Sequence, residues 1–158
     1  MKTVKPGCGR LRLSMQFDML LASVCLLLLF TACAKVPVYS AAPFDGNKVR
    51  IELNSLTEKK ALFYTFQYRG SKKINYFVIR IDGEVQSYFD ACIKCYPRKL
   101  GYQAHNDRLV CRACNVDYSV YDLKDGIGSC YPIKLKGHAE GYFYLIDKDD
   151  LLQGIKYF

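Results

Sequence analysis

Hydrophobic and polar residues alternate along several short stretches of this chain, and the alternation predicts β-strands. Residues 61–68 follow this pattern and are rich in the aromatic residues that favour strands, and a second strand is expected at 74–81. Asp82-Gly83 then gives a tight-turn signal ahead of a further alternating stretch, so these segments predict a β-hairpin. The remaining strands are expected at residues 85–89, 108–111, 116–123, 131–135 and 141–146.

Helical signals are confined to two segments. Asp147 and Asp149 are suitable N-cap residues, so one short helix is expected over residues 147–155. Residues 53–61 are expected to hold a helical turn. The chain therefore predicts a small, mostly β single domain of antiparallel strands with cysteine-bearing turns and a short C-terminal helix.

Residues 1–33 have a different pattern, which is typical of an export signal. A basic stretch is followed by an apolar run, Met19 to Phe30, and by small residues before Cys33. This run is shorter than the ~20 residues that a transmembrane helix needs. The stretch LFTAC at 29–33 resembles the lipobox of bacterial lipoproteins, in which the cysteine becomes the lipidated first residue after cleavage.

This resemblance predicts three segments. Residues 1–32 are expected to form a lipoprotein signal peptide, and residues 33–48 a lipidated Cys33 followed by a tether. The domain is expected at 49–158. The alternatives are an ordinary signal peptide cut near Ala32 or an uncleaved anchor. The protein is thus expected in the cell envelope, attached by lipid to the extracytoplasmic side of a bacterial membrane.

The net charge of +8 agrees with a location beside an anionic membrane surface. The basic residues are scattered among acidic ones and form no stripe, so nucleic acid is not an expected partner. The sequence offers no Ser/His/Asp set, no phosphate-binding glycine-rich loop and no carboxylate pair at a useful spacing. We therefore expect no enzymatic activity.

The chain has eight cysteines, and those in the expected domain are Cys92, Cys95, Cys111, Cys114 and Cys130. Disulfides are the default for an exported protein. An odd number cannot pair completely, however, and a Cys-x-x-Cys disulfide closes too short a loop to stabilise much. The spacing C-x2-C-x15-C-x2-C is instead typical of four thiolates that surround one metal centre, because each tight turn directs two sulfurs to the same point.

The first four domain cysteines, Cys92, Cys95, Cys111 and Cys114, are therefore the expected metal ligands, in a zinc-ribbon-like pattern. Ligand type alone permits zinc or an iron–sulfur cluster. Cys130 is either an additional ligand or a redox thiol near the site. A thiol–disulfide protein with cycling cysteine pairs is a further alternative. The histidines, His105 and His138, are expected in solvated turns.

The stretch from Phe63 to Leu135 resembles the FtrD-like family of membrane iron–sulfur-containing proteins, which is linked to bacterial ferrous iron transport. The motifs that carry the resemblance are DACIKC (90–95), GYQ (101–103), VCRAC (110–114) and GSCYPI (128–133). The last motif includes the fifth cysteine. Tyr96 and Asn115 stand where the family usually has glycine after each cysteine pair. Asn tolerates a left-handed backbone and Tyr does so less well, so the first turn is expected to differ in shape.

The resemblance implies an iron–sulfur cluster and a role in electron transfer or iron handling with a membrane redox or iron-transport partner. The leader lacks the Arg-Arg pair of the export route for folded proteins. A single zinc, iron or copper ion acquired after export is therefore the alternative cofactor. The alternative function is a structural zinc site that holds together a β domain acting as a binding module.

Overall fold

The computed structural model describes residue 37 and residues 39–70, 72–123 and 130–158. The predicted signal peptide and Cys33 lie outside the described residues. The described part belongs to one compact unit. Its architecture is mostly β, as predicted, with antiparallel sheets and a short C-terminal helix.

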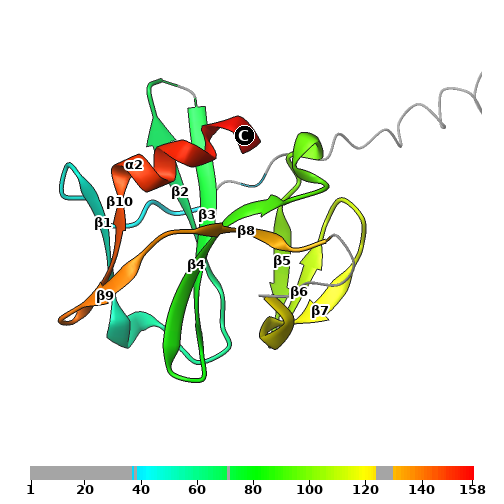
Figure 1. The fold of residues 1–158 in the computed structure, drawn as a ribbon, viewed down its shortest axis with the longest axis horizontal. Helices are drawn as coiled ribbons and strands as arrows, with labels where there is room; N and C mark the ends of the chain where they lie inside the picture. Colours follow the sequence, from blue (N-terminus) through cyan, green and yellow to red (C-terminus); the bar gives the residue numbers. More distant parts are fainter. Residues whose placement is uncertain (1–36, 38, 71, 124–129) are drawn as a thin grey trace, which may run out of the picture. The chain divides into compact units, whose positions relative to one another are not determined.

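A central antiparallel sheet, in the order β2-β3-β4-β8, organises the unit (Figure 1). The turn between β3 and β4 confirms the predicted hairpin: Asp82 and Gly83 both have positive φ, 52° and 79°, as a two-residue hairpin turn requires. The strands of this sheet are β2 (Leu62–Tyr68), β3 (Lys72–Ile81), β4 (Glu84–Cys92) and β8 (Pro132–Leu135).

Two smaller antiparallel sheets accompany the central one. The first has the order β1-β10-β9 and the second the order β5-β6-β7. Their strands are β1 (Lys48–Glu52), β10 (Phe143–Asp147), β9 (His138–Glu140), β5 (Tyr102–His105), β6 (Arg108–Cys111) and β7 (Asp117–Ser119). The helical elements are α2 (Lys148–Leu152) and the 3-10 helices η1 (Leu53–Ser55), η2 (Tyr96–Arg98), η3 (Val120–Leu123) and η4 (Gln153–Tyr157).

Most predicted elements are confirmed, with two kinds of difference. The predicted strand 116–123 is wrong in its second half, because β7 ends at Ser119 and the chain continues as η3. The strands β1, β5 and β9 were not predicted. They are short, and β9 is exposed along its whole length, so none of them has a hydrophobic pattern of useful length.

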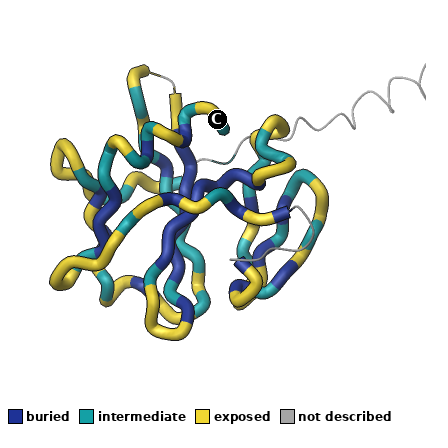
Figure 2. The backbone as a smooth tube through the Cα atoms, in the orientation of Figure 1, coloured by how far each residue is buried: buried dark blue, intermediate teal, exposed yellow. Residues whose placement is uncertain are grey.

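The central sheet is buried on both faces, and two hydrophobic cores form on either side of it. Figure 2 shows the central strands as the most continuous buried stretch of the chain. Alternate residues of β3 enter different cores, because successive strand side chains point to opposite faces. The first core, shared with β1, β10 and α2, takes Ile74, Tyr76 and Val78. The second core, shared with β5, β6 and β7, takes Phe77, Ile79 and Ile81.

Part of the segment predicted to be a tether packs on the domain instead. The backbone N–H of Tyr39 donates to Thr65 Oγ1 over 2.9 Å, and the N–H of Thr65 donates to the carbonyl of Ser40 over 3.1 Å. The ring of Tyr39 lies 5.0 Å from that of Phe63. These contacts follow from the free edge of β2, whose unpaired backbone groups accept a neighbouring segment.

Candidate metal centre

The five domain cysteines come from three separate parts of the fold, and strand geometry brings them together. Cys92 ends β4 on the face that forms the second core, whereas its neighbour Ala91 enters the first core. Cys111 ends β6 and belongs to the same second core. The pairing of β4 with β8 places Cys92 opposite Pro132. Just beyond it, Ile93 N–H donates to the carbonyl of Tyr131 over 3.0 Å, which brings Cys130 alongside Cys92.

The sulfur atoms form one cluster. The Sγ atom of Cys130 lies 3.4 Å from that of Cys92 and 3.4 Å from that of Cys114. Two triads share Cys111, and within each triad all sulfurs lie within 4.8 Å of one another; the triads are Cys92-Cys95-Cys111 and Cys111-Cys114-Cys130. A tetrahedral ion with metal–sulfur bonds of about 2.3 Å has sulfurs about 3.8 Å apart, so these separations suit thiolate ligation of metal.

The backbone of each Cys-x-x-Cys turn points N–H groups at the first sulfur of the pair. The N–H groups of Lys94 and Cys95 face the Cys92 sulfur. Those of Ala113 and Cys114 face the Cys111 sulfur in the same way. This repeated arrangement is the one that stabilises thiolates at a metal, because the negative charge on sulfur meets several donors.

The two turns differ after the second cysteine, as the sequence predicted. Asn115 adopts the left-handed conformation with φ of 57°, and its N–H donates to the carbonyl of Cys111 over 2.8 Å. Tyr96 instead begins the 3-10 helix η2, and the left-handed residue comes three positions later at Lys99, with φ of 54°. The bulkier Tyr96 therefore lengthens the first turn.

The surroundings shift the pKa values of two thiols in the cluster, Cys92 and Cys130, in opposite directions. Burial opposes ionisation of Cys92, but the N–H groups of Lys94 and Cys95 hold the pKa of this thiol below its usual value. Burial and the neighbouring Cys114 and Cys92 raise the pKa of Cys130 far above the ordinary range. Metal binding at such a cluster must therefore release protons, and this couples affinity to pH.

Access to the cluster is from one side. Cys92, Cys111 and Cys130 are buried, Cys95 is half-buried and Cys114 is exposed. A hollow of about 470 Å³ opens onto the sulfurs and has a basic rim; it is lined by Lys94, Cys95, Pro97, Arg98, Cys114, Val116 and Cys130. The solvent-facing edge of the site is thus made by the second cysteine of each pair.

A buried carboxylate joins the two cysteine turns, and sequence reasoning did not single it out. Asp90 is 3% exposed; its Oδ1 accepts from the N–H of Tyr102 over 2.6 Å and its Oδ2 from the hydroxyl of Tyr39 over 3.1 Å. Burial raises the pKa of Asp90 to about 6. Arg112, between Cys111 and Cys114, donates from Nη1 to the same Tyr39 hydroxyl over 3.3 Å. The signal in the sequence was the pair of motifs Asp-Ala-Cys and Val-Cys-Arg.

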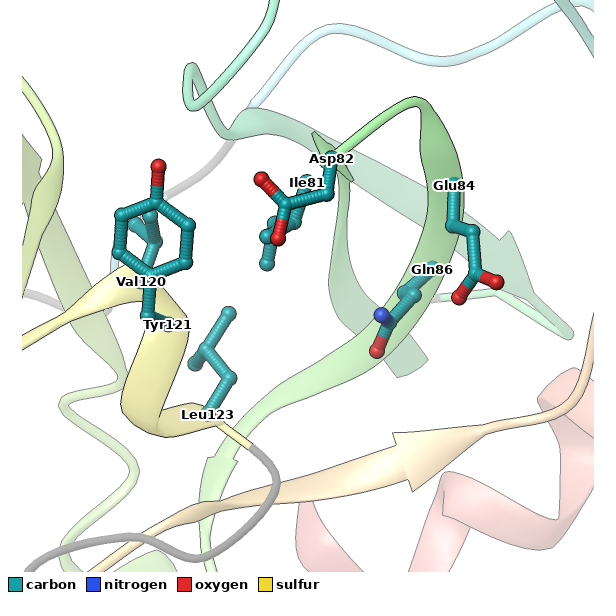
Figure 3. A pocket seen from close by; sticks show the side chains of 7 residues that line it. All are labelled: Ile81, Asp82, Glu84, Gln86, Val120, Tyr121 and Leu123. Carbon is teal, nitrogen blue, oxygen red and sulfur yellow. The ribbon is translucent and has the colours of Figure 1, made fainter.

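Other polar features of the described residues lie apart from the sulfurs. His105 and His138 are exposed, as predicted, but they lie at strand ends, in β5 and β9, and not in turns. A second hollow, of about 290 Å³, lies between the β3–β4 hairpin and η3, with Asp82, Glu84 and Gln86 on one side and Tyr121 and Leu123 on the other (Figure 3). It has no thiol or histidine in its lining, so the cysteine cluster is the candidate functional site.

The donor set fits a soft metal ion or an iron–sulfur cluster, because both are held by cysteine thiolates. The fold and the site together define a small β domain with a cysteine cluster that can hold metal. The chain belongs to the family of membrane iron–sulfur-containing proteins that are FtrD-like, whose family model matches residues 56–158. This match confirms the resemblance seen in the sequence motifs.

Comparison with curated proteins and with solved structures gives no match. The family is described as one of membrane proteins. Across the residues that the structure describes, no helix is long and apolar enough to cross a membrane.

Proposed function

We propose that this protein is a membrane-anchored extracytoplasmic lipoprotein that binds an iron–sulfur cluster or metal ion and takes part in electron transfer or iron handling. Cys92, Cys95, Cys111 and Cys114 are the proposed ligands. The observation that carries the proposal is the convergence of five thiols from three parts of the chain. Membership of an iron–sulfur family supports it further.

A role in transfer to a partner is supported by the one-sided access to the cluster. The half-buried Cys95 and exposed Cys114 lie beside an open hollow, and its rim carries Lys94 and Arg98. A redox or iron-transport protein of the membrane can approach the sulfurs from this side without unfolding the domain. When bound, the metal centre supplies the redox or ion-binding chemistry, and the chain supplies the thiolates and the donors that stabilise them.

Attachment to the membrane through lipid on Cys33 is the second part of the proposal. It rests on the lipobox-like stretch LFTAC and on the apolar run before it. A Cys33→Ser variant is expected to leave the membrane fraction and to lose incorporation of labelled palmitate. Retention of the label in that variant would exclude Cys33 as the lipidated residue.

A single metal ion in a structural site is the second candidate, and the sulfur separations favour it. Within each of the two sulfur triads the sulfurs lie within 4.8 Å of one another, which suits a single ion. A [4Fe–4S] cluster, in which each cysteine binds a different iron, holds its cysteine sulfurs further apart. In this candidate a zinc ion stabilises the β domain, and a surface of the domain performs the binding function.

The deciding experiment measures metal and acid-labile sulfide, together with the visible spectrum, on the full chain purified without air. Iron with matching sulfide and a brown chromophore supports the cluster and electron transfer. One zinc per chain without sulfide supports the structural site. A protein that contains neither metal nor sulfide, and binds no added iron, zinc or cobalt, contradicts the metal-binding proposal in both forms.

A further inference from the structure

Two tyrosine hydroxyls are buried beside the sulfur cluster without a hydrogen-bond partner. Tyr102 and Tyr118 are both 0% exposed. Their Oη atoms are the buried side-chain polar atoms that lack a partner at hydrogen-bond geometry among the described residues. Buried tyrosine hydroxyls normally find a partner, so a pair of unpaired ones at one place requires an explanation.

Both side chains lie on the face of their sheet that carries Cys111, because of strand pairing. Tyr102 on β5 is paired in register with Cys111 on β6, and Leu109 of β6 is paired with Tyr118 on β7. The two rings meet edge to face with centroids 6.3 Å apart. The polar neighbours of the Tyr102 hydroxyl are the Tyr118 hydroxyl and the Cys92 sulfur.

A tyrosine hydroxyl holds its proton at neutral pH, because its ordinary pKa is about 10. Each tyrosine therefore offers an O–H donor inside the core that also contains Cys92, Cys111 and Cys130.

We propose that Tyr102 and Tyr118 are positioning residues that donate O–H···S hydrogen bonds to the ligand sulfurs when the site is in its thiolate form. This inference rests on the proposed metal site. A neutral thiol is a weak acceptor, whereas a thiolate is a strong one, so the two hydroxyls gain their partners when the cysteines lose their protons to bind metal. Hydrogen bonds to the sulfurs also set the potential of an iron–sulfur centre and the affinity of a metal site.

This role differs in its consequences from ordinary core packing. A hydroxyl without a partner costs stability in the thiol form, so its removal should leave the metal-free domain as stable as before or more stable. The same removal should weaken metal binding, because the thiolate form loses a donor. A purely structural tyrosine would show the opposite result, with lower stability and unchanged affinity.

The test uses the full chain, reduced and free of metal, in a titration with cobalt(II) against a competing chelator. Tyr102→Phe and Tyr118→Phe are each expected to weaken cobalt binding by about 10-fold, which is the usual effect of losing a hydrogen bond to a ligand. The sulfur-to-cobalt charge-transfer band should move to lower energy, because a sulfur without its donor holds its electrons less tightly. Urea unfolding of the metal-free variants should show no loss of stability.

Tyr144→Phe is the matched control. Tyr144 is buried in the other core, and its hydroxyl lies 3.0 Å from Ser87 Oγ. This variant should lose stability and keep both the cobalt affinity and the band position. Wild-type cobalt affinity and band position in both Tyr102→Phe and Tyr118→Phe would overturn the inference and leave the metal site standing. Failure of the wild type to bind cobalt, iron or zinc would instead overturn the proposed function.

Discussion

Replacement of Gly101 by alanine should strongly destabilise the domain, because Gly101 lies against the buried Asp90. Gly101 has φ of +64°, in the left-handed region. An added Cβ would overlap the Asp90 carboxylate, with only 2.5 Å to Oδ1 and 2.6 Å to Cγ. Asp90 cannot move aside freely, since it accepts from Tyr102 N–H over 2.6 Å and from the Tyr39 hydroxyl over 3.1 Å.

The expected loss of unfolding free energy in Gly101→Ala has two parts. The left-handed backbone costs alanine about 1–2 kcal/mol. Loss of one hydrogen bond to the charged Asp90 costs about 1.5–3 kcal/mol more. Gly101→Ala should therefore lower the free energy of unfolding by about 2.5–5 kcal/mol, a large fraction of the roughly 5–15 kcal/mol of a typical domain. Equilibrium urea unfolding of the anaerobic protein, followed by circular dichroism, measures this loss.

Gly141→Ala separates the two parts. Gly141 has φ of +58° and nothing within 4 Å of an added Cβ, so only the backbone cost applies there. Equal losses in the two variants, within about 0.5 kcal/mol, would refute the reasoning, because the clash with Asp90 would then cost nothing. In an Asp90→Ala background, Gly101→Ala should cost only as much as Gly141→Ala does.

Three further predictions concern the cysteines and the buried tyrosines. Cys111→Ser should lose the metal and most of the fold, because Cys111 belongs to both sulfur triads. The control His105→Ala changes an exposed residue and should bind metal normally. Metal analysis and circular dichroism compare the two variants, and normal metal binding by Cys111→Ser would contradict the four-thiolate site. Cys130→Ser should keep its metal content per chain, and a loss of metal would make Cys130 a ligand. Burial, aided by Tyr144, raises the pKa of Tyr88 to about 12. The folded state therefore holds this proton more tightly than the unfolded state, so the free energy of unfolding should fall as pH rises above about 10. Urea midpoints below and above that pH measure the fall, and Tyr88→Phe should make it smaller.

The sequence by itself determined the mostly β class and the main hairpin. A run of mostly apolar residues marks the strand at 74–81, because a strand buried on both faces needs apolar residues at consecutive positions. Asp82-Gly83 supplies the positive φ of a two-residue turn. Cysteine spacing likewise determined the two turns, since each pair acts through local geometry. The motif resemblance to the FtrD-like family is also a property of the sequence alone, and the family match confirms it.

Only the tertiary structure decided what surrounds those turns. The position of Cys130 beside Cys92 depends on the pairing of β4 with β8, two strands far apart in the chain, and no local pattern encodes such a contact. Tyr102 enters the second core from β5, a strand too short to show a period, and the pairing of β7 with β6 brings Tyr118 into the same core. The role of Asp90 was also decided by the tertiary structure. A polar residue in a strand can be recognised as a buried hydrogen-bond acceptor only when its partners, here Tyr102 N–H and the Tyr39 hydroxyl, are known.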